Sequence, residues 1–294
     1  MPAAEIRLGF ILATLAALGY SLKAIFIKLA YPYGVDAVTL LMLRMAFSLP
    51  AFLWIWWVTR PAESNLTVGD CARVTLMGII GYYGASILDF WGLQYITAGL
   101  ERLILFTYPT LTILIGVVFQ GKPFTRREGV AMLLCYGGIG LAFAHDMRFG
   151  EAGAVIAGGA LVFASSVCYA CYLSGSEGMI ARLGARRFTA LAMLVSSAGI
   201  FLHFALTRSP ASLQLPWPVF GWSIAMAVLS TVAPVFILAE AIRRIGAGRT
   251  ALASMLGPLL TIIFGWWLLG EAVSLEQMLG AALVIAGILV VSRL

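Results

Sequence analysis

Charged residues are scarce in this chain. Of its 294 residues, only 11% are charged and 62% are hydrophobic, whereas a soluble domain carries about 25% charged residues. No soluble core could bury so much apolar surface, so the composition predicts a helical protein that crosses a lipid bilayer several times. The net charge of +6 does not indicate a nucleic-acid partner, because the basic residues lie between apolar runs and form no patch with interleaved aromatic residues.

Residues that build metal, redox and catalytic sites are also few. The chain has two histidines and four cysteines. Cys168 and Cys171 form a C-x-x-C motif inside an apolar run with no histidine or acid beside it, whereas a zinc site needs four ligands. Neither a Walker loop nor an H-E-x-x-H motif is present. We therefore expect no catalytic residues, no metal and no cofactor, and any transport would have to use a gradient of the solute or of an ion.

The apolar runs predict ten membrane-spanning helices. They cover residues 8–29, 37–58, 73–95, 98–119, 127–145, 153–174, 188–207, 219–242, 247–269 and 275–292. Each run has about the length that a helix needs to cross the hydrocarbon core of a bilayer. No loop is long enough for a soluble domain, so the predicted fold class is an all-α integral membrane protein.

The second half of the chain repeats the first at a shift of 149 positions. The matching pairs are Ala98/Ala247, Gly99/Gly248, Leu103/Leu252, Pro109/Pro258, Thr112/Thr261, Ile113/Ile262, Gly116/Gly265, Gly121/Gly270, Leu134/Leu283, Gly138/Gly287 and Ile139/Ile288. The repeat predicts two five-helix units, residues 1–146 and 147–294. Because five is odd, the second unit would lie in the membrane upside down relative to the first, and inverted repeats usually meet at a site near the midplane.

Pro109 and Pro258 lie in the middle of the fourth and ninth predicted helices, at equivalent positions of the repeat. A proline removes one backbone hydrogen bond, and in lipid this opening is tolerated only where protein or a water-filled cavity meets it. Matching interrupted helices in two halves point to the binding site of a transporter. We therefore expect a hinge or gate at both prolines; the alternative is that they are ordinary kinks of membrane helices.

The basic residues at the ends of the predicted helices indicate the orientation. Thirteen Lys and Arg residues border one side of the membrane, and four border the other, namely Lys28, Arg102, Arg148 and Arg208. Because cytoplasmic loops carry the excess of basic residues, both termini are predicted to lie in the cytoplasm.

Three charged side chains lie inside predicted helices: Lys23, Arg44 and Asp89. At about 1.5 Å per residue, all three lie roughly 5–8 Å on the outer side of the midplane. Charges at this depth are functional candidates by default. We expect Asp89 to pair with Lys23 or Arg44 and to leave one cation free for a carboxylate of the ligand; a buried structural ion cluster without ligand contact is the alternative.

Two tyrosines complete the predicted substrate site. At 100° per residue, Tyr82 shares one face of the third predicted helix with Asp89 and several small residues, namely Gly78, Gly81, Ala85 and Gly92. Tyr169 lies beside Ser165 and Ser166 in the sixth; both tyrosines have simple helix packing as the alternative. Glu101, Arg102 and Glu240 fall near helix ends, where charges reach the membrane interface, and His203 is expected to be a hydrogen-bonded core residue.

The repeat resembles the drug/metabolite transporter superfamily, in its ten-helix branch built from two EamA-type repeats. The residues that carry the resemblance are Leu93 to Gly99 and Pro109 in the first copy, and Ala247, Gly248, Pro258, Gly270, Glu271, Gly280 and Gly287 in the second. Within the superfamily the chain is most similar to aromatic amino acid exporters of the YddG type. The resemblance implies export across a bacterial inner membrane through a central cavity between the halves. The chain departs from the family pattern at two places. Lys122 stands in the first copy where the second copy has Glu271. Four-helix relatives in the superfamily couple transport to protons through an acid in their first helix, whereas the first predicted helix of this chain contains Lys23 and no acid.

These observations predict a transporter that exports small metabolites by alternating access, with amino acids, including aromatic ones, as the leading substrates. Its partners would be a small-molecule substrate and the lipid bilayer. A carrier of drugs or sugar phosphates is the alternative within transport; a membrane enzyme or a non-transporting subunit agrees less well with the matched prolines. The sequence is compatible with a monomer and does not determine the oligomeric state.

Overall fold

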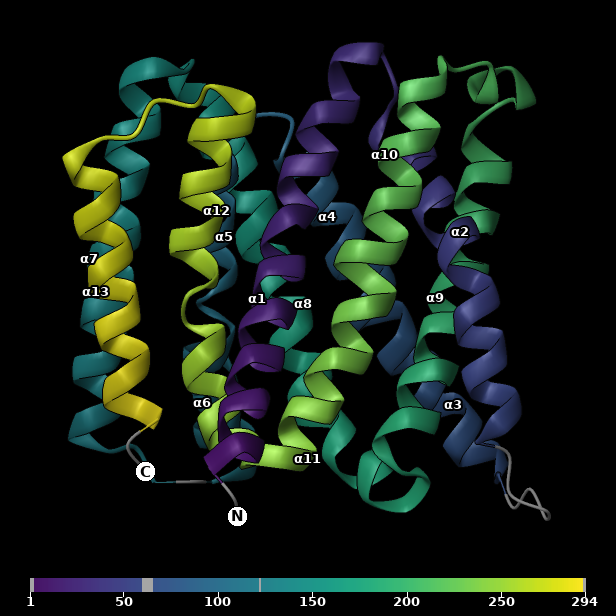
Figure 1. Ribbon diagram of the computed structural model, residues 1–294, viewed down its shortest axis with the longest axis horizontal. Helices are drawn as coiled ribbons and strands as arrows, with labels where there is room; N and C mark the ends of the chain where they lie inside the picture. Colours follow the sequence, from purple (N-terminus) through teal and green to yellow (C-terminus); the bar gives the residue numbers. More distant parts are fainter. Residues whose placement is uncertain (1–2, 60–65, 122, 293–294) are drawn as a thin grey trace.

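The computed structural model describes residues 3–59, 66–121 and 123–292, and within these ranges every regular element is a helix (Figure 1). The elements are α1 (Ala3–Ala30), η1 (Tyr31–Tyr33), α2 (Ala37–Val58), α3 (Val68–Met77), η2 (Gly78–Gly84), α4 (Ala85–Gly92), α5 (Ala98–Leu105), α6 (Tyr108–Gln120), α7 (Arg126–Phe149), α8 (Ala152–Leu183), α9 (Ala185–Thr207), η3 (Pro210–Leu213), α10 (Trp217–Ala227), η4 (Val228–Val232), α11 (Ala233–Ser254), α12 (Gly257–Phe264), η5 (Gly265–Leu269) and α13 (Leu275–Ser292). They form ten membrane segments. The third consists of α3, η2 and α4, the fourth of α5 and α6, and the eighth of α10, η4 and α11 as far as Gly246. The ninth runs from the end of α11 through α12 and η5.

Helix boundaries follow local backbone chemistry. Asp36 caps α2 by accepting hydrogen bonds from the backbone N–H groups of Val38 and Thr39, and Thr97 caps α5 in the same way. Gly246 has φ 81° and ψ 161°, a conformation that favours glycine. It separates the eighth and ninth segments without an intervening loop. In the described part of the chain, eight stretches are long and apolar enough to span a membrane, while Gly257–Leu269 and Leu275–Val290 are shorter.

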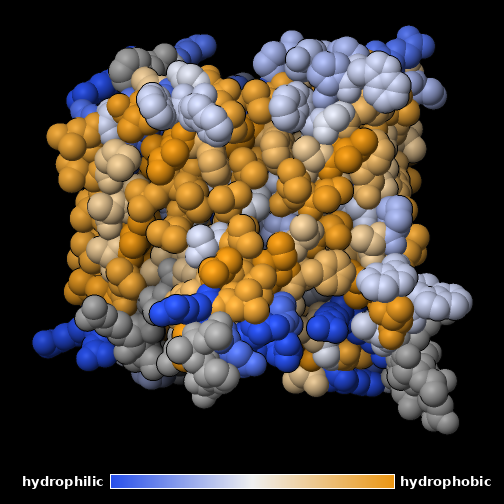
Figure 2. All heavy atoms as spheres, in the orientation of Figure 1, coloured by the Kyte–Doolittle hydropathy of each residue, from blue (hydrophilic) through white to orange (hydrophobic). Residues whose placement is uncertain are grey.

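The surface has the pattern of a membrane protein. Figure 2 shows a broad hydrophobic band between two hydrophilic ends. Large apolar side chains are exposed within it, for example Leu133 at 78% and Trp267 at 70%. In a soluble protein such an exposed surface would cause aggregation, whereas lipid chains solvate it. Helix α1 begins and α13 ends at the same end of the bundle (Figure 1), as ten crossings require.

The two repeats interleave rather than forming separate bodies. The fifth and tenth segments pack together as α7 and α13, and the second and seventh as α2 and α9. Helix α1 packs on α11 of the second repeat, and α8 packs on α4 of the first. The first segment thus packs on the eighth, and the equivalent sixth segment packs on the third. Each of these two contacts is the counterpart of the other in the opposite repeat, which is the arrangement expected of inverted repeats.

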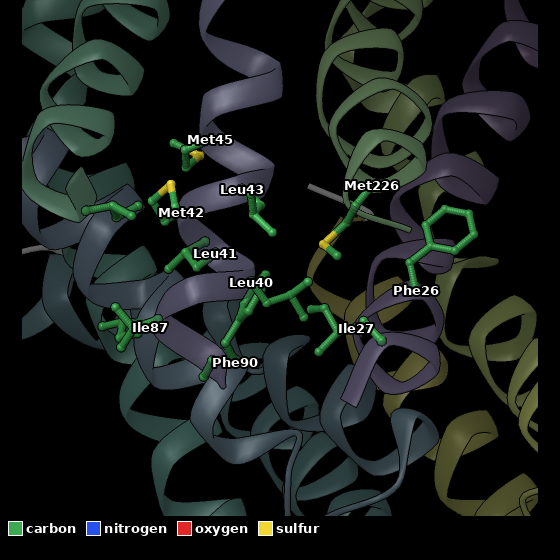
Figure 3. Packing of buried hydrophobic residues seen from close by; sticks show 14 of the residues in the cluster. Phe26, Ile27, Leu40, Leu41, Met42, Leu43, Met45, Ile87, Phe90 and Met226 are labelled. Atoms are coloured by element: carbon green, nitrogen blue, oxygen red, sulfur yellow. The ribbon is translucent and has the colours of Figure 1, made fainter. Parts of the chain in front are cut away.

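A buried apolar cluster joins the two repeats beside the middle of the bundle. Figure 3 shows Leu40 of α2 beside Phe90 of α4 and Ile27 of α1, with Met226 of α10 close by. Leu40, Phe90 and Ile27 are each 0% exposed. This core fixes the positions of α1, α2 and α4, the three helices that carry the charged residues predicted to bind substrate.

Candidate functional site

A cavity of 340 Å³ lies between the two repeats, and eight of the ten membrane segments contribute side chains to its wall. All five residues predicted to bind substrate line it: Lys23, Arg44, Tyr82, Asp89 and Tyr169. The structure therefore brings these five together from four different segments, since Tyr82 and Asp89 both belong to the third. Whether they contact a ligand remains a prediction.

The cavity wall is built from equivalent positions of the two repeats. Many of its lining positions are equivalent at the shift of 149, including Ala17/Ser166, Tyr20/Tyr169, Arg44/Met193, Gly81/Ser230, Tyr82/Thr231 and Asp89/Leu238. The positions are symmetric but the chemistry is not. The cations and the acid in the wall all come from the first repeat, and the second contributes hydroxyl, aromatic and apolar groups.

Two π-helices face the cavity at equivalent positions. Segments η2 and η4 interrupt the third and eighth membrane helices, and Tyr82 and Thr231 project from them into the cavity. A π-helical turn accommodates extra residues and often marks a functional site. It also changes the face that a regular helix would present. Gly81 and Ala85 line the cavity as predicted.

The remaining glycines on that predicted face pack against neighbouring helices instead. A Cβ atom at Gly78 would approach the backbone of Ala192 at 2.7 Å, and one at Gly92 would approach Gly158 at 2.8 Å. The small residues of this face therefore allow close helix packing at Gly78 and Gly92 and access to the cavity at Gly81 and Ala85.

The fourth and ninth segments are broken beside the cavity, as the matched prolines predicted. The turns lie at Phe106–Thr107 and at Met255–Leu256, and the proline of each pair sits near the start of the helix that follows. A proline is tolerated there because the first backbone N–H groups of a helix have no partner within it. Pro109 and Pro258 do not themselves line the cavity. Their hinge or gate role stays a prediction.

Hydroxyl groups from the other repeat bind the carbonyl groups near each break. Ser166 of α8 donates to the carbonyl of Leu105 at 3.2 Å and lies 2.7 Å from the Thr107 hydroxyl. Ser21 of α1 donates to the carbonyl of Gly257 at 3.0 Å. Unpaired carbonyl groups would be costly at this depth, so these serines stabilise both broken helices.

Lys23 stands between two buried carboxyl groups. Its ammonium nitrogen lies 2.6 Å from Asp89 and 3.0 Å from Glu101. The pairing of Asp89 with Lys23 was one of two predicted options. The prediction that Glu101 reaches the membrane interface is wrong, because this residue is 0% exposed. Thr97 caps α5 one turn earlier and directs the first turn of the helix into the protein rather than toward water.

Arg44 and Arg102 are the cations that remain beside the cavity. Arg44 donates from Nε to the Thr231 hydroxyl at 3.0 Å and lies 5.7 Å from the centre of the Phe90 ring. Arg102 lies 5.2 Å from the centre of the Phe106 ring, and its Nε atom is buried without a hydrogen-bond partner. Neither guanidinium forms an ion pair within the described residues. The prediction placed Arg102 at the interface, so this second free cation was missed.

Tyrosine rings form one wall of the cavity. Tyr169 packs edge-to-face on Tyr108 with ring centres 5.2 Å apart and stacks on Tyr172 at 5.8 Å. The Tyr172 hydroxyl lies 3.2 Å from that of Tyr82. The wall combines apolar ring surface with polar hydroxyl groups, which suits an amphipathic ligand.

Ion pairs join the two repeats at the end of the bundle where α1 ends. Lys28 lies 2.9 Å from Glu271, and Glu271 also accepts from the backbone N–H of Ala98 at the start of α5. Arg208 lies 2.9 Å from Asp36. Burial raises the pKa of Asp36, but hydrogen bonds from Thr39 and Arg208 outweigh it and hold this pKa below its ordinary range.

His203 lies outside the cavity wall and has a hydrogen-bond partner, as predicted. Its Nδ1 atom is 2.9 Å from the Tyr83 hydroxyl. Ser165 donates to the carbonyl of Ala85 at 2.7 Å, so it bridges helices as well as lining the cavity.

Broken helices and π-helical turns recur at equivalent positions of the two halves, and both halves line one shared cavity. This is the arrangement of a transporter built from inverted repeats. The sequence model of the EamA-like transporter family matches residues 7–144 and again residues 156–293. The chain belongs to the EamA-like transporter family. The two matched ranges are offset by the same 149 positions as the internal repeat and cover most of the chain.

Relatives of this EamA-like transporter agree with a transport function. The uncharacterized transporter YcbK of Bacillus subtilis is 30% identical over 94% of this chain and 90% of its own length. The uncharacterized transporter YyaM of the same organism is 28% identical over 74% of this chain and 72% of its own length. A crystal structure that superposes with a TM-score of 0.67 covers 96% of both chains at 17% identity and shows the same fold. The protein is thus a membrane transporter rather than an enzyme, and these names specify no substrate and give no support to the YddG type in particular.

Proposed function

We propose that this transporter exports small amphipathic metabolites, chiefly amino acids including aromatic ones, by alternating access through the central cavity. The observation that carries the proposal is the pair of arginines, Arg44 and Arg102, which face the cavity without a carboxylate partner among the described residues. The tyrosine wall of Tyr82, Tyr108 and Tyr169 shares the same cavity.

The arginines favour an anionic group on the ligand. A buried cation without a partner is costly, and a guanidinium can bind a carboxylate through two parallel hydrogen bonds. Counting Lys23, Arg44 and Arg102 against Asp89 and Glu101 leaves an excess of one positive charge even when both acids are ionised. A ligand carboxylate would neutralise this excess.

The cavity size and the aromatic wall favour an amino acid over a larger solute. Ligand cavities span about 300–1,000 Å³, and 340 Å³ lies at the small end of this range. Tyrosine rings pack well against apolar and aromatic side chains. A sugar phosphate is the second candidate, because two free guanidinium groups also suit a phosphate.

Counterflow in liposomes that contain only this protein tests the proposal. Labelled phenylalanine would be exchanged against internal phenylalanine, with competition by unlabelled phenylalanine and by phenylalaninamide, which lacks the carboxylate. Arg44→Gln and Arg102→Gln should each raise the half-inhibitory concentration of phenylalanine about tenfold or more, the equivalent of one lost charged hydrogen bond. They should change that of the amide far less. Arg148→Gln, a change at a guanidinium that is 67% exposed, serves as the matched control.

Two outcomes would contradict the proposal. Exchange of a labelled hexose phosphate without exchange of phenylalanine would assign the cavity to the second candidate. An equal loss of competition by the acid and by its amide would leave both arginines as structural charges.

We further propose that Pro109 and Pro258 act as hinges of the broken helices during alternating access. Their support is the pair of helix breaks at equivalent positions beside the cavity. Replacing either proline by alanine should reduce the exchange rate by more than it reduces the amount of folded protein. Wild-type exchange in both variants would reduce them to ordinary kinks.

For the cellular setting we propose the bacterial inner membrane, with both termini in the cytoplasm, on the strength of the basic residues at that end. Reporter fusions after Leu294 and after Arg208 should report opposite sides of the membrane, and the same side for both would overturn this topology. We propose that a monomer suffices for transport in a lipid bilayer, because the two repeats of one chain already face each other across the cavity.

A further inference from the structure

Two buried carboxyl groups converge on a single ammonium group beside the cavity. Asp89 and Glu101 are 3% and 0% exposed, and both approach Lys23, at 2.6 and 3.0 Å. Asp89 and Lys23 line the cavity, whereas Glu101 lies behind them. We call these three residues the acid pair and its lysine.

The acid pair lacks the hydrogen bonds that two ionised carboxylates would need. Asp89 Oδ1 and Glu101 Oε2 are buried without a hydrogen-bond partner in the described structure, and Glu101 Oε1 has only the 3.0 Å ion-pair contact with Lys23. The charged or titratable groups that neighbour the pair are Lys23 within α1, Tyr31 directly after α1, Arg44 on α2 and Arg102 on α5. Of these, Lys23 forms the ion pairs with the acids.

The charge count then favours one bound proton. Two like charges that share one buried site cannot both persist easily, and one of them takes up a proton. With one proton on the pair, a single carboxylate faces the single ammonium of Lys23 and the cluster is neutral.

We propose that Asp89 and Glu101 form a proton-binding site, and that ligand binding in the cavity displaces this proton. In the step, an O–H bond of the carboxyl pair breaks and the proton passes to water in the cavity. The ammonium group of the ligand then takes the proton's place beside the ionised pair. The ligand carboxylate is held by Arg44 and Arg102, so one bound amino acid exchanges for one proton. This coupling rests on the proposed amino acid transport, whereas the proton site itself does not.

The repeat supplies no second acid pair. The positions equivalent to Lys23, Asp89 and Glu101 hold Tyr172, Leu238 and Thr250. Thr250 donates its hydroxyl to the carbonyl of Gly246 at 2.8 Å, so it completes an ordinary helix hydrogen bond. We therefore expect one displaced proton for each bound ligand.

The proton site can be tested without any ligand. Infrared spectra of the full chain in lipid should show the C=O band of a protonated carboxyl group at neutral pH, which disappears at alkaline pH. Glu101→Gln and Asp89→Asn should each abolish one carboxyl equivalent of this band, because the remaining acid then pairs with Lys23 as a carboxylate. Glu276→Gln, at an exposed acid paired with Arg148, should leave the band unchanged. A wild-type band in both acid-pair variants would overturn the proton site.

The coupling is tested by the pH dependence of phenylalanine binding to the reconstituted wild type. If one proton is displaced, the half-saturating concentration should rise about tenfold for each unit by which the pH falls on the acidic side of the transition. Glu101→Gln should remove this dependence, whatever its absolute affinity. Binding of phenylalanine that is indifferent to pH would overturn the coupling but leave amino acid transport standing. A titrating band in a protein that does not bind phenylalanine would leave the proton site standing and refute the proposed substrate.

Discussion

Replacing Lys23 by methionine removes the one cation that lies between two buried acids. Methionine keeps much of the length and volume of the lysine side chain, so the change acts mainly on charge. In wild type the ammonium contacts Asp89 at 2.6 Å and Glu101 at 3.0 Å. In the variant, at least one carboxylate would remain buried without a counter-charge.

The expected loss is about 3–5 kcal/mol of unfolding free energy, the range for a buried ion pair from which one partner is removed. The low exposure supports this range, because the side chains of Lys23, Asp89 and Glu101 are 16%, 4% and 0% exposed. Removing the charge of Asp89 as well should recover most of the loss in the double variant Lys23→Met/Asp89→Asn, since Glu101 can then hold a proton and leave no charge unpaired. Acid should also reduce the loss in the single variant, because protonation removes the unpaired charge.

Reversible unfolding in mixed micelles, followed by tryptophan fluorescence, measures these differences. Arg148→Met is the control, because its ion pair with Glu276 is exposed and should be worth no more than about 1 kcal/mol. A loss for Lys23→Met no larger than that of the control would refute the buried ion cluster. A double variant less stable than Lys23→Met would refute the pairing of Lys23 with Asp89.

Two further changes test the packing around the cavity and the ion pairs at its end. Gly81→Ala places a Cβ atom against the Tyr172 ring, so this overpacked core change should lower the unfolding free energy by about 1–3 kcal/mol. Gly137→Ala is the control, because an added Cβ atom there meets no atom within 4 Å. Equal thermal stability of the two variants would contradict the close packing at Gly81. Asp36→Asn removes an ion pair with Arg208 that is about one-third exposed on both sides, so it should cost no more than about 1 kcal/mol. The folded-state pKa of Asp36 is lowered, so the pair should stabilise the wild type fully at pH values above the ordinary aspartate pKa and should lose this contribution only as the pH falls through the lowered pKa. If wild type and Asp36→Asn became equally stable already near neutral pH, the lowered pKa would be contradicted.

The helices were largely predictable because lipid imposes a simple rule on apolar length. Residues 37–58 were predicted as one helix and α2 spans Ala37–Val58, since an apolar run follows the capping side chain of Asp36. The breaks near Pro109 and Pro258 were also predictable, because proline cannot complete the backbone hydrogen bonds of the preceding turn. Gly246 was harder to interpret, since a single residue with positive φ divides two helices there.

The site was predictable only in part, because sequence gives the depth of a residue better than its surroundings. The depths of Lys23, Arg44 and Asp89 were enough to predict that Asp89 pairs with one of the two cations, but not that Lys23 is the partner. The position of Glu101 near a helix end suggested contact with water, but Glu271 and Lys28 cover that end of α5. The π-helical turns have no clear signal in the sequence, and they decide which side chains of the third and eighth segments enter the cavity.

The interleaved packing of the two repeats has a consequence for the synthesis of the chain. Helix α1 emerges first, yet its main packing partner, α11, is made near the end of translation. Lys23 can pair with Asp89 and Glu101 as soon as the fourth segment has been inserted, because all three belong to the first repeat. Arg44 must wait for Thr231 of the second repeat. The nascent first half can therefore enter the bilayer with its acids already neutralised, while its helices acquire their final neighbours only when the last segments arrive.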